Sequence, residues 1–465
     1  MAGNLRSRLS AIRRFRTADR PAGNVSPPEM APKAAPETAP KTLPKAAPET
    51  APPKPEKGRS SGGAPAVPGG VFSAWETAGE GLLRRRLRLP PSRPVPAALP
   101  AALPLVLPDL APAAGSRSPG RILFFDLETT GLSGGAGTVA FLAAFGTFEG
   151  ENSLGDYSAL VIDQFLLLDY SGETAFLDAV LRFINDPRFP GSCLATYNGK
   201  TFDTQILKTR CLMNGFEPPK LFQLDLLYPS RRMWKRLLPN CSQATIETMV
   251  LGLDRSGDIP GALAPEIWFD FLKSNGSGAG RLLGICDHNV KDIQGLAALF
   301  AAFCEIAEHP LDASAVFHCD TERLAMIWRR RLIRGGPPLF RDVSGGGFER
   351  TSSELLEAAA RDYPRSCLRL GLDLFRKGRF REGRAALARA ADERVSWRVS
   401  PGPVVRAMAL RSLALDAARR LGSAEKAAAF LEKALLLDRR ESGPAPLPRR
   451  LREDLERLLR RCGPP

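Results

Sequence analysis

The chain has 465 residues, of which 44% are hydrophobic and 25% are charged, and its formal net charge at pH 7 is +15. This length leaves room for two or three domains, and at least one of them can bury a core of ordinary size. The apolar run at residues 99–107 is interrupted by prolines, which argues against a membrane-spanning helix. Arginines between residues 6 and 16 have no apolar segment behind them, so we expect no secretory signal.

The positive charge is concentrated near the N-terminus. Residues 1–117 hold 18 Lys and Arg against 8 Asp and Glu. A basic protein attracts polyanions, and phosphate neutralisation is independent of base sequence, so the charge predicts nucleic acid as a partner. The alternatives are a membrane surface and a basic tail that only aids solubility.

Cysteine usage indicates the redox compartment. The eight cysteines are scattered with no C-x-x-C pair, and several fall in apolar helical stretches, where free Cys behaves as a small hydrophobic residue. Because the chain has only three histidines, a zinc cluster is not expected. We therefore expect a reducing, cytoplasmic location.

The first 118 residues are typical of an arm rather than of a domain. Residues 1–20 place apolar side chains on one helical face and arginines elsewhere, which predicts a basic amphipathic segment that contacts nucleic acid, lipid or its own domain. Residues 21–118 are rich in Pro and Ala and are predicted to be a disordered linker. Within this linker, residues 71–90 regain apolar character and could add an ordered edge segment to the next domain.

Residues 119–310 alternate between strand and helix signals. Buried strands are predicted for RILFFDLETTG from residue 121, TVAFLAAFGTFEG from residue 138, YSALVIDQFLLL from residue 157 and SCLATYNG from residue 192. Helical spacing is found at residues 171–186 and 201–215 and in a long segment from about residue 281 to residue 308. This order predicts an α/β domain with a mixed sheet.

The remainder of the chain is predicted to be helical. Residues 311–350 are basic and Gly-rich and are interpreted as a connector, whereas residues 351–465 are rich in Ala, Leu and Arg. Two helix-turn-helix units overlay in this second segment at an offset of 44 residues, with Gly378, Leu387 and Ala390 matching Gly422, Leu431 and Ala434. The tetratricopeptide period is about 34 residues, so such a unit would carry an additional loop here. A generic helical bundle is the alternative.

Three short motifs carry candidate chemistry. Asp126 and Glu128 end an apolar strand; because side chains two residues apart on a strand share a face, both carboxylates project to one side. In the second motif, a strand leads through Asn198 into a helix whose first turn holds Asp203, although acidic residues are also favoured there by the helix dipole. In the third, His288 and Asp292 lie four residues apart on one face of the long helix, a spacing that also occurs in simple surface contacts.

These motifs follow one another in the order D-x-E, N-x-x-x-F-D and H-x-x-x-D. In this order the chain resembles the DEDD superfamily of 3′–5′ exonucleases, which are DnaQ-like members of the RNase H fold, and within it the YprB-type RNase H-like family. Residues 224–236, 241–261 and 288–299 support the resemblance, which covers roughly residues 121–308. It implies an RNase H-like mixed sheet flanked by helices, followed by an all-α tetratricopeptide-like helical module and preceded by a disordered N-terminal region.

The resemblance also implies a site. Asp126, Glu128, Asp203 and Asp292 take the four metal-binding carboxylate positions, and His288 takes the position of the residue that orients or deprotonates the attacking water. His288 lies four residues before Asp292, as in members with a Tyr at this position, whereas members with a His usually have five.

Hydrolysis of a phosphodiester requires stabilisation of a highly charged state, for which two Mg²⁺ or Mn²⁺ ions held by carboxylates are suited. We therefore expect a metal-dependent nuclease that acts as a 3′–5′ exonuclease on single-stranded DNA or RNA ends. The alternatives are a catalytically silent nucleic-acid-binding adaptor that works through its helical module, and a structure-specific endonuclease. The module would bind a protein partner or stabilise the catalytic domain. Possible phosphate contacts, which could equally be solvated surface residues, are Asn198, Arg231, Arg232, Lys235 and Arg236.

Overall fold

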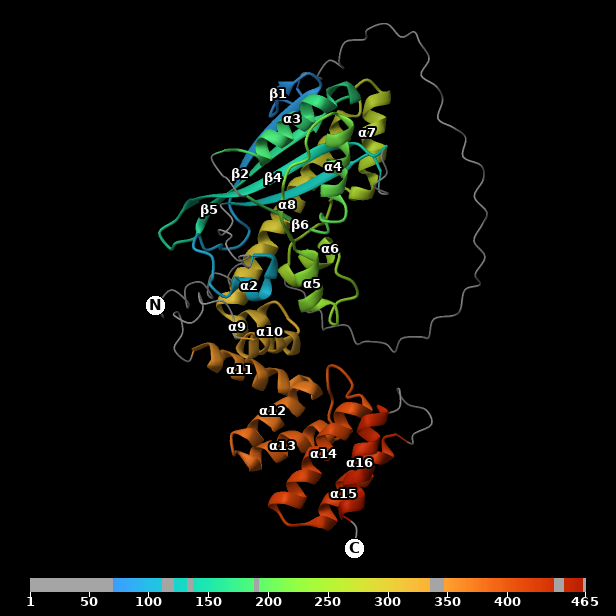
Figure 1. Cartoon of the computed structure of the whole chain (residues 1–465). Helices are drawn as coiled ribbons and strands as arrows, with labels where there is room; N and C mark the ends of the chain where they lie inside the picture. The colour runs from blue at the N-terminus through green and yellow to red at the C-terminus, as the bar shows by residue number, and fades with distance from the viewer. Residues whose placement is uncertain are drawn as a thin grey trace, which may run out of the picture.

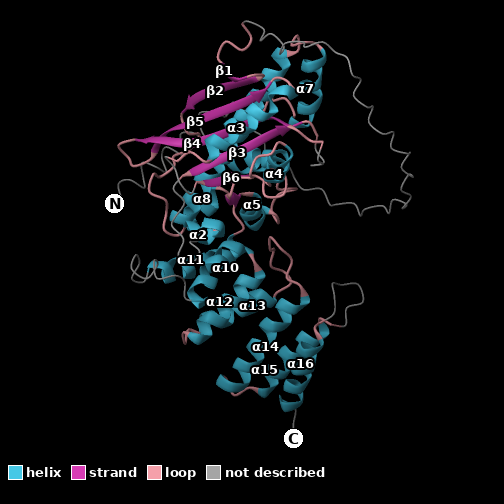
Figure 2. Ribbon diagram, turned by 45° about the horizontal axis from the view of Figure 1, so that its top comes forward, coloured by secondary structure: helices cyan, strands magenta, loops and turns pink. Residues whose placement is uncertain are grey.

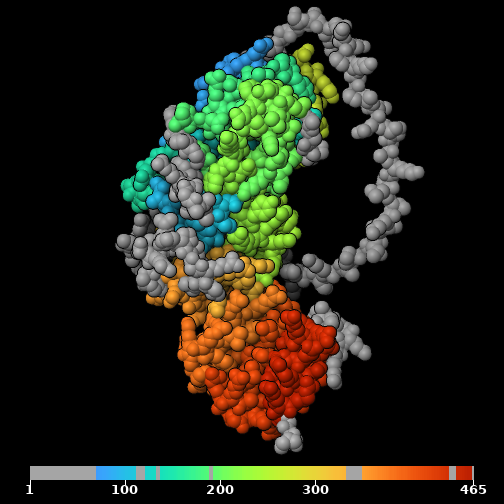
Figure 3. All heavy atoms as spheres, viewed as in Figure 1, coloured from blue at the N-terminus to red at the C-terminus, as the bar shows by residue number. Residues whose placement is uncertain are grey.

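The computed structural model describes residues 70–110, 121–131, 137–187, 192–334, 347–438 and 447–462. The basic segment predicted for residues 1–20 and the part of the predicted linker before residue 70 lie outside these residues. In the space-filling view, the α/β domain and the C-terminal helices form one elongated body (Figure 3). The described helices include none that combines the length and the apolar composition needed to cross a bilayer.

The described strands form one mixed sheet with the order β1-β2-β5-β4-β3-β6-β7. Every neighbouring pair is antiparallel except β3 with β6 and β6 with β7, which are parallel. The sheet and its flanking helices are seen in Figures 1 and 2. The strands are β1 (Glu76–Gly79), β2 (Leu82–Leu89), β3 (Ile122–Thr129), β4 (Ala140–Glu151), β5 (Tyr157–Leu167), β6 (Cys193–Thr196) and β7 (Phe222–Asp225).

Strand β3 occupies a central place in this sheet. Leu123, Phe124 and Phe125 are fully buried because β4 and β6 flank the strand and side chains cover both of its faces. A strand covered on both faces is expected to read as a continuous apolar run. The run ends in Asp126 and Glu128, which alternate with the buried Leu127 and share the strand face of Phe124.

Helices cover the two faces of the sheet. One core contains side chains of α3 (Glu173–Ile184), α4 (Asp203–Met213), α7 (Ala264–Lys273) and the first half of α8 (Ala279–Glu308). The other core contains the second half of α8 together with α5 (Leu227–Trp234), α6 (Gln243–Ile246) and the π-helical turn η3 (Glu247–Leu251). A short 3-10 turn, η2 (Tyr170–Gly172), precedes α3, and another, η4 (Gly261–Leu263), precedes α7. Helix α8 runs along one face of the sheet, where it contacts Gln164 and Asp126 through its first half and Phe124 through its second, and its apolar residues belong to both cores.

The structure corrects the assignment of residues 91–110 to a disordered linker. This segment forms α2 (Leu103–Val106) and the 3-10 turn η1 (Pro108–Leu110), and its apolar side chains enter the core beside α8. Its prolines are compatible with this order because Pro104 stands at the start of α2, where no intrahelical donor is needed. The hairpin of β1 and β2, within residues 71–90, extends the sheet by pairing with β5.

The assignment of residues 311–350 to a connector is wrong for its first part. Residues 310–334 form α9 (Pro310–Val316) and α10 (Thr321–Arg334). Phe317, Leu324 and Trp328 are buried in the same core as the second half of α8. The sequence obscured this packing because arginines on the outer side of α10 give the segment a basic composition.

The C-terminal region is helical, as the sequence predicts. It contains α11 (Gly347–Asp362), α12 (Pro364–Arg376), α13 (Phe380–Ala391), α14 (Pro403–Arg420), α15 (Ala424–Leu436) and α16 (Arg449–Cys462). The matched residues Gly378 and Gly422 occupy equivalent turns, between α12 and α13 and between α14 and α15, with φ of 74° and 64°. Positive φ favours glycine, which explains why the glycines recur at this offset.

Candidate active site

One cleft at the end of β3 contains all five residues predicted to be catalytic. It has a volume of about 230 Å³. The predicted residues that line it are Asp126, Glu128, Asn198, Asp203, His288 and Asp292. They come from β3, from the turn and helix after β6, and from the middle of α8, so three distant segments meet at one point.

Asp126 is held by α8. Nδ2 of Asn289 donates a 2.8 Å hydrogen bond to Oδ2 of Asp126, and Asn289 is itself fully buried. Burial raises the pKa of Asp126 well above its usual range, and the charges of Asp292, Asp203 and Glu128 raise it further. The carboxyl group is therefore poor at carrying a negative charge unless a cation is present.

Asn289 is the end of a chain of hydrogen bonds that reaches the edge of the sheet. Its Oδ1 accepts a 2.9 Å bond from Nε2 of Gln164, which also donates to the backbone oxygen of Cys286 at 2.8 Å. The guanidinium of Arg85 donates to Oε1 of Gln164 at 2.7 and 2.9 Å. Because every amide group in this chain is occupied, the Asn289 side chain has one orientation toward Asp126.

Asp203 begins α4 and is placed by the turn that precedes it. Asn198 adopts a left-handed conformation with φ of 65°. The buried carboxylate of Asp225 accepts bonds from the backbone N–H groups of Asn198 (2.8 Å), Lys200 (3.3 Å) and Leu227 (3.1 Å). Burial raises the pKa of Asp203 to about 7; a backbone hydrogen bond opposes this shift, and the charges of Asp225 and Asp292 add to it.

His288 and Asp292 meet Glu128 in a compact group. One possible ligand atom from each of these three residues lies within 4.8 Å of the others. Nε2 of His288 is 3.2 Å from Oδ2 of Asp292, and Nδ1 is 2.9 Å from Oδ2 of Asp258. The imidazole is thus held between two carboxylates, one of which lies in the loop before α7.

Arg255 neutralises part of the acidic cluster. Its guanidinium contacts Asp292 at 2.5 Å, Glu247 at 2.6 Å and Asp258 at 2.8 Å. Burial raises the pKa of Asp292, whereas His288 and Arg255 oppose this shift. Burial also raises the pKa of Asp258, but hydrogen bonds from Arg255, His288 and Lys291 outweigh it and leave this pKa below its ordinary value.

The cluster therefore has the chemistry of a cation site. Burial raises the pKa of Glu128 well above its usual range, followed by the charges of Asp292 and Asp203. One guanidinium cannot compensate four clustered carboxylates, and hard oxygen donors of this kind suit Mg²⁺ or Mn²⁺. The donor set fits a divalent ion.

The predicted phosphate-binding residues fall into two groups. Arg231 on α5 and Lys235, the residue after α5, are exposed, Asn198 is exposed at the cleft, and Arg232 on α5 is half-buried. Arg236 instead contacts Asp320 at 2.5 and 2.7 Å and Glu322 at 2.9 Å, and both carboxylates are buried. The inclusion of Arg236 among the phosphate contacts is therefore corrected, because its guanidinium is used to join α5 to α10.

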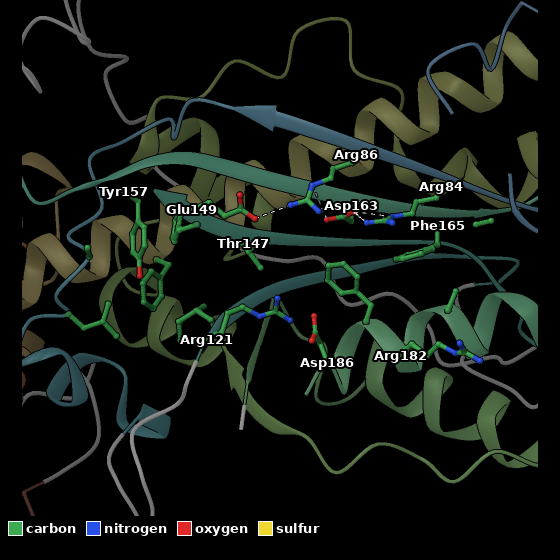
Figure 4. A pocket seen from close by; sticks show the side chains of 18 residues that line it. Arg84, Arg86, Arg121, Thr147, Glu149, Tyr157, Asp163, Phe165, Arg182 and Asp186 are labelled. Carbon is green, nitrogen blue, oxygen red and sulfur yellow. Dashed lines mark hydrogen bonds and ion pairs between the residues drawn. The ribbon is translucent and has the colours of Figure 1, made fainter. Parts of the chain in front are cut away.

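A larger groove lies at the opposite end of β3 (Figure 4). It has a volume of about 700 Å³ and is lined by β2, β5 and α3 among others. Its arginines face carboxylates: Arg84 contacts Asp163 at 2.5 Å and Arg86 contacts Glu149 at 2.9 Å. These ion pairs account for the charges on its β2 side, and the predicted catalytic residues all lie elsewhere.

Sequence reasoning missed the residues that hold the predicted ones in place. Asn289, Asp258, Arg255 and Asp225 were not singled out, although they stand in or beside the motifs. A signal was present for Asn289, a polar residue on the inward side of an otherwise apolar helix. No comparable local signal marks Arg255, because its contact with Asp292, which ties it to the cluster, is brought about only by the fold.

Comparison with known proteins bears on the same part of the chain. Residues 123–304 match the RNase_H superfamily. The α/β domain is therefore RNase H-like, as the sequence predicts. The matched residues include the five predicted catalytic residues, whereas β1, β2 and the C-terminal helices lie outside the match.

A curated relative and a solved structure are also similar. The chain is 35% identical over 182 residues to the uncharacterized protein YprB of Bacillus subtilis (strain 168). This similarity covers 38% of the present chain and 41% of the relative, so the chain spans less than half of that protein's length. The family B DNA polymerase from the hyperthermophilic archaeon Pyrobaculum calidifontis aligns with a TM-score of 0.29 and 14% identity, over 46% of this chain and 29% of the polymerase.

Proposed function

We propose that this protein is a divalent-metal-dependent nuclease that hydrolyses phosphodiester bonds and acts as a 3′–5′ exonuclease on single-stranded ends. The observation that carries the proposal is the meeting of Asp126, Glu128, Asp203 and Asp292 with His288 in one cleft of an RNase H-like domain. The polarity and the preference for ends rest on the DEDD resemblance. All eight cysteines are free, which accords with the cytoplasmic location proposed from the sequence.

The four carboxylates would hold Mg²⁺ or Mn²⁺, with two ions expected. When bound, such ions polarise the phosphate, activate a water and stabilise the leaving oxygen. Asn289 keeps Asp126 oriented toward the cleft. The N-terminus of α4 fixes Asp203, and the Asp225 carboxylate holds the turn before it.

His288 would take the proton of the attacking water. A histidine is suited to this role because its ordinary pKa is near neutrality. The contact from Nδ1 to Asp258 orients the ring and leaves Nε2 directed toward Asp292 and the cleft. His288 precedes Asp292 by four residues, whereas DEDD members with a His usually have five. At this spacing the imidazole still lies 3.2 Å from the Asp292 carboxylate.

Asn198, Arg231, Arg232 and Lys235 would bind the phosphates of the substrate. Asn198 lines the cleft, and the three basic residues lie on α5 or at its C-terminal end, on a helix that begins two residues after Asp225. Basic side chains beside an acidic metal site would guide a polyanion to it.

Degradation of labelled oligonucleotides tests the proposal. The full chain is incubated with 3′- and 5′-labelled single-stranded DNA and RNA in Mg²⁺, Mn²⁺ or EDTA. We expect metal-dependent release of labelled mononucleotide from the 3′ end and loss of activity in Asp203→Asn. The matched control is Asp270→Asn, at an exposed position of α7, which should retain full activity.

Each alternative predicts a different result. A catalytically silent adaptor would degrade no substrate in any metal, or would degrade equally well in wild type and Asp203→Asn. A structure-specific endonuclease would cut a circular single strand, which has no end for an exonuclease to attack.

A further inference from the structure

The outer face of α5 carries an aromatic ring among basic side chains. Arg231 and Arg232 follow Tyr228 by three and four residues and so lie on its side of the helix, and Lys235, which caps the helix, follows by seven. Tyr228 is 48% exposed although it is a large hydrophobic residue. Met233 and Trp234, by contrast, are fully buried. The exposed tyrosine therefore needs an explanation other than packing.

This face begins at the rim of the cleft. The carboxylate of Asp225 joins the backbone N–H of Asn198, which lines the cleft, to that of Leu227, the first residue of α5. The neighbouring Tyr197 also lines the cleft, and its hydroxyl donates to the backbone oxygen of Cys241 at 2.7 Å. A chain leaving the cleft on this side meets α5 first.

Helix α5 is fixed to α10. Besides the ion pairs of Arg236, the backbone N–H of Asp320 donates to the oxygen of Met233 at 3.0 Å. Nε1 of Trp234 donates to the backbone oxygen of Phe317 at 2.9 Å. Because the partners of Arg236 are buried carboxylates, breaking this junction would be costly, so the two helices keep one relative position.

Helix α10 is fixed in turn to α12 of the helical module. Arg329 forms a two-pronged ion pair with Asp373, with one contact of 2.9 Å, and the hydroxyl of Ser366 lies 3.3 Å from Oε1 of Glu322. The three helices follow one another down the molecule in Figures 1 and 2. The surface from the cleft to the helical module is thus held together by buried and half-buried polar contacts.

Like charges line this junction. Arg330 on α10 is exposed. Burial lowers the pKa of Arg232; the charge of Asp109 opposes this shift, and the charge of Arg330 adds to it. Burial, followed by the charge of Arg329, lowers the pKa of Arg369 on α12, whereas Asp373 and Glu322 oppose this shift.

The nearby carboxylates are already engaged. Asp109 contacts Lys200 at 2.6 Å, and Asp373 pairs with Arg329. Within the described part of the chain, Arg232, Arg330 and Arg369 have no carboxylate within ion-pair distance. Arginines that repel one another and have no acidic partner are typical of surfaces that bind a polyanion.

We propose that the outer face of α5 together with Arg330 and Arg369 forms a track along which the single-stranded substrate leaves the cleft and reaches the helical module. The proposal rests on the proposed nuclease function and gives the module a role in binding substrate. Tyr228 stacks on a base, and the arginines neutralise successive phosphates. The substrate class is therefore single-stranded nucleic acid long enough to extend from the cleft to α12.

Binding of fluorescent oligonucleotides by the full-length Asp203→Asn protein tests the track. A strand of about 4 nucleotides and one of about 20 are compared, a span that brackets the site sizes of single-strand-binding surfaces. In the Arg330→Ala/Arg369→Ala variant, we expect roughly a tenfold weaker affinity for the long strand and no change for the short one. Each phosphate contact adds about 0.7 to the steepness with which the logarithm of the binding constant falls with the logarithm of salt concentration. For the long strand, this slope should therefore be shallower by about 1.4 in the variant that lacks two arginines.

The matched control removes two arginines from other exposed positions of the module. Arg419→Ala/Arg450→Ala, on α14 and α16, should bind the long strand as tightly as the parent protein. Tyr228→Phe should retain the long-strand affinity and Tyr228→Leu should lower it, because only the ring is needed for stacking. Thermal unfolding of each variant shows that the fold is intact.

The track is overturned if the Arg330→Ala/Arg369→Ala variant binds the long strand as the parent does, or if the control loses as much affinity. The first result would leave an acidic protein partner as the occupant of the arginines. These outcomes are separate from those of the nuclease proposal. If the wild type cleaves substrate but Arg330→Ala/Arg369→Ala binds the long strand normally, only the track is rejected. If the long strand binds through these arginines but no metal supports cleavage, only the nuclease function is rejected.

Discussion

Asn289 donates a 2.8 Å hydrogen bond to Asp126 across 163 positions of the chain, and it is the contact through which α8 orients the first carboxylate of β3. The same side chain accepts from Gln164, which is held by Arg85 of the β2 hairpin. A segment outside the matched superfamily range therefore supports the candidate active site.

Replacement of Asn289 by Leu should reduce activity while the fold is retained. Loss of an outer partner of a metal-binding carboxylate costs about 10- to 100-fold in metal affinity or activity. The measurement is the initial rate as a function of Mn²⁺ concentration, in which the half-saturating concentration should rise. Asp270→Asn, at an exposed position of α7, is the control and should behave as wild type. An unchanged Mn²⁺ dependence in Asn289→Leu would show that Asp126 needs no orienting partner.

The metal-free protein should lose stability as the pH rises. The pKa of Asp203 is about 7 in the folded protein against 3.8 for the ordinary carboxyl group. The folded state binds the Asp203 proton more tightly than the unfolded state does. The stability that this proton contributes is therefore complete below about pH 4 and is lost as the pH rises to about 7. In EDTA at pH 7.5, Asp203→Asn should therefore melt at a higher temperature than wild type, and the difference should shrink toward pH 4.

Addition of Mn²⁺ provides the matching control for this titration. A bound cation relieves the repulsion among the carboxylates, so the wild type should gain more thermal stability than Asp203→Asn. If both proteins gain equally, Asp203 is not a metal ligand.

Gly295 of α8 should not tolerate even a methyl group. A Cβ added there would lie 1.6 Å from Oε1 of Glu247, whose other oxygen holds Arg255. Replacement of an interior helical glycine by Ala ordinarily stabilises by about 1 kcal/mol. Gly295→Ala should instead lower both the unfolding midpoint and the activity, because Glu247 must move. Gly280→Ala on the same helix, where a Cβ meets open space, should be neutral or stabilising; similar behaviour of the two variants in thermal melts would contradict this account.

Arg236 and Lys235 should have separable effects although they are neighbours. Arg236→Ala leaves Asp320 and Glu322 buried without their partner, which is expected to cost about 3–5 kcal/mol of stability. Lys235→Ala removes an exposed charge and should raise the KM for single strands while the unfolding midpoint stays the same. Denaturant unfolding and steady-state kinetics of both variants provide the measurements. A normal unfolding midpoint in Arg236→Ala would return that residue to the group of phosphate contacts.

Much of the α/β domain could be predicted from local patterns. The apolar run predicts β3, Gly215 predicts the end of α4, and the helical spacing of apolar residues predicts α8. Each of these patterns involves only residues that are near neighbours in the sequence. The clustered acids carry only weak signals one by one, and it is the order of their motifs along the chain that singles them out together. The structure brings all five predicted residues into one cleft, including His288 at the four-residue spacing.

The sequence by itself determined the main strands and helices between residues 121 and 308, the positions of the acidic side chains and the helical nature of the C-terminal region. Only the tertiary structure decided that β2 pairs with β5, that residues 91–110 and 310–334 enter the core, and that Arg255 and Asp258 join the site. The physical reason is the range of the forces concerned. Backbone periodicity and turn preferences act between near neighbours, whereas burial and charge pairing depend on which distant segments the packed core brings together.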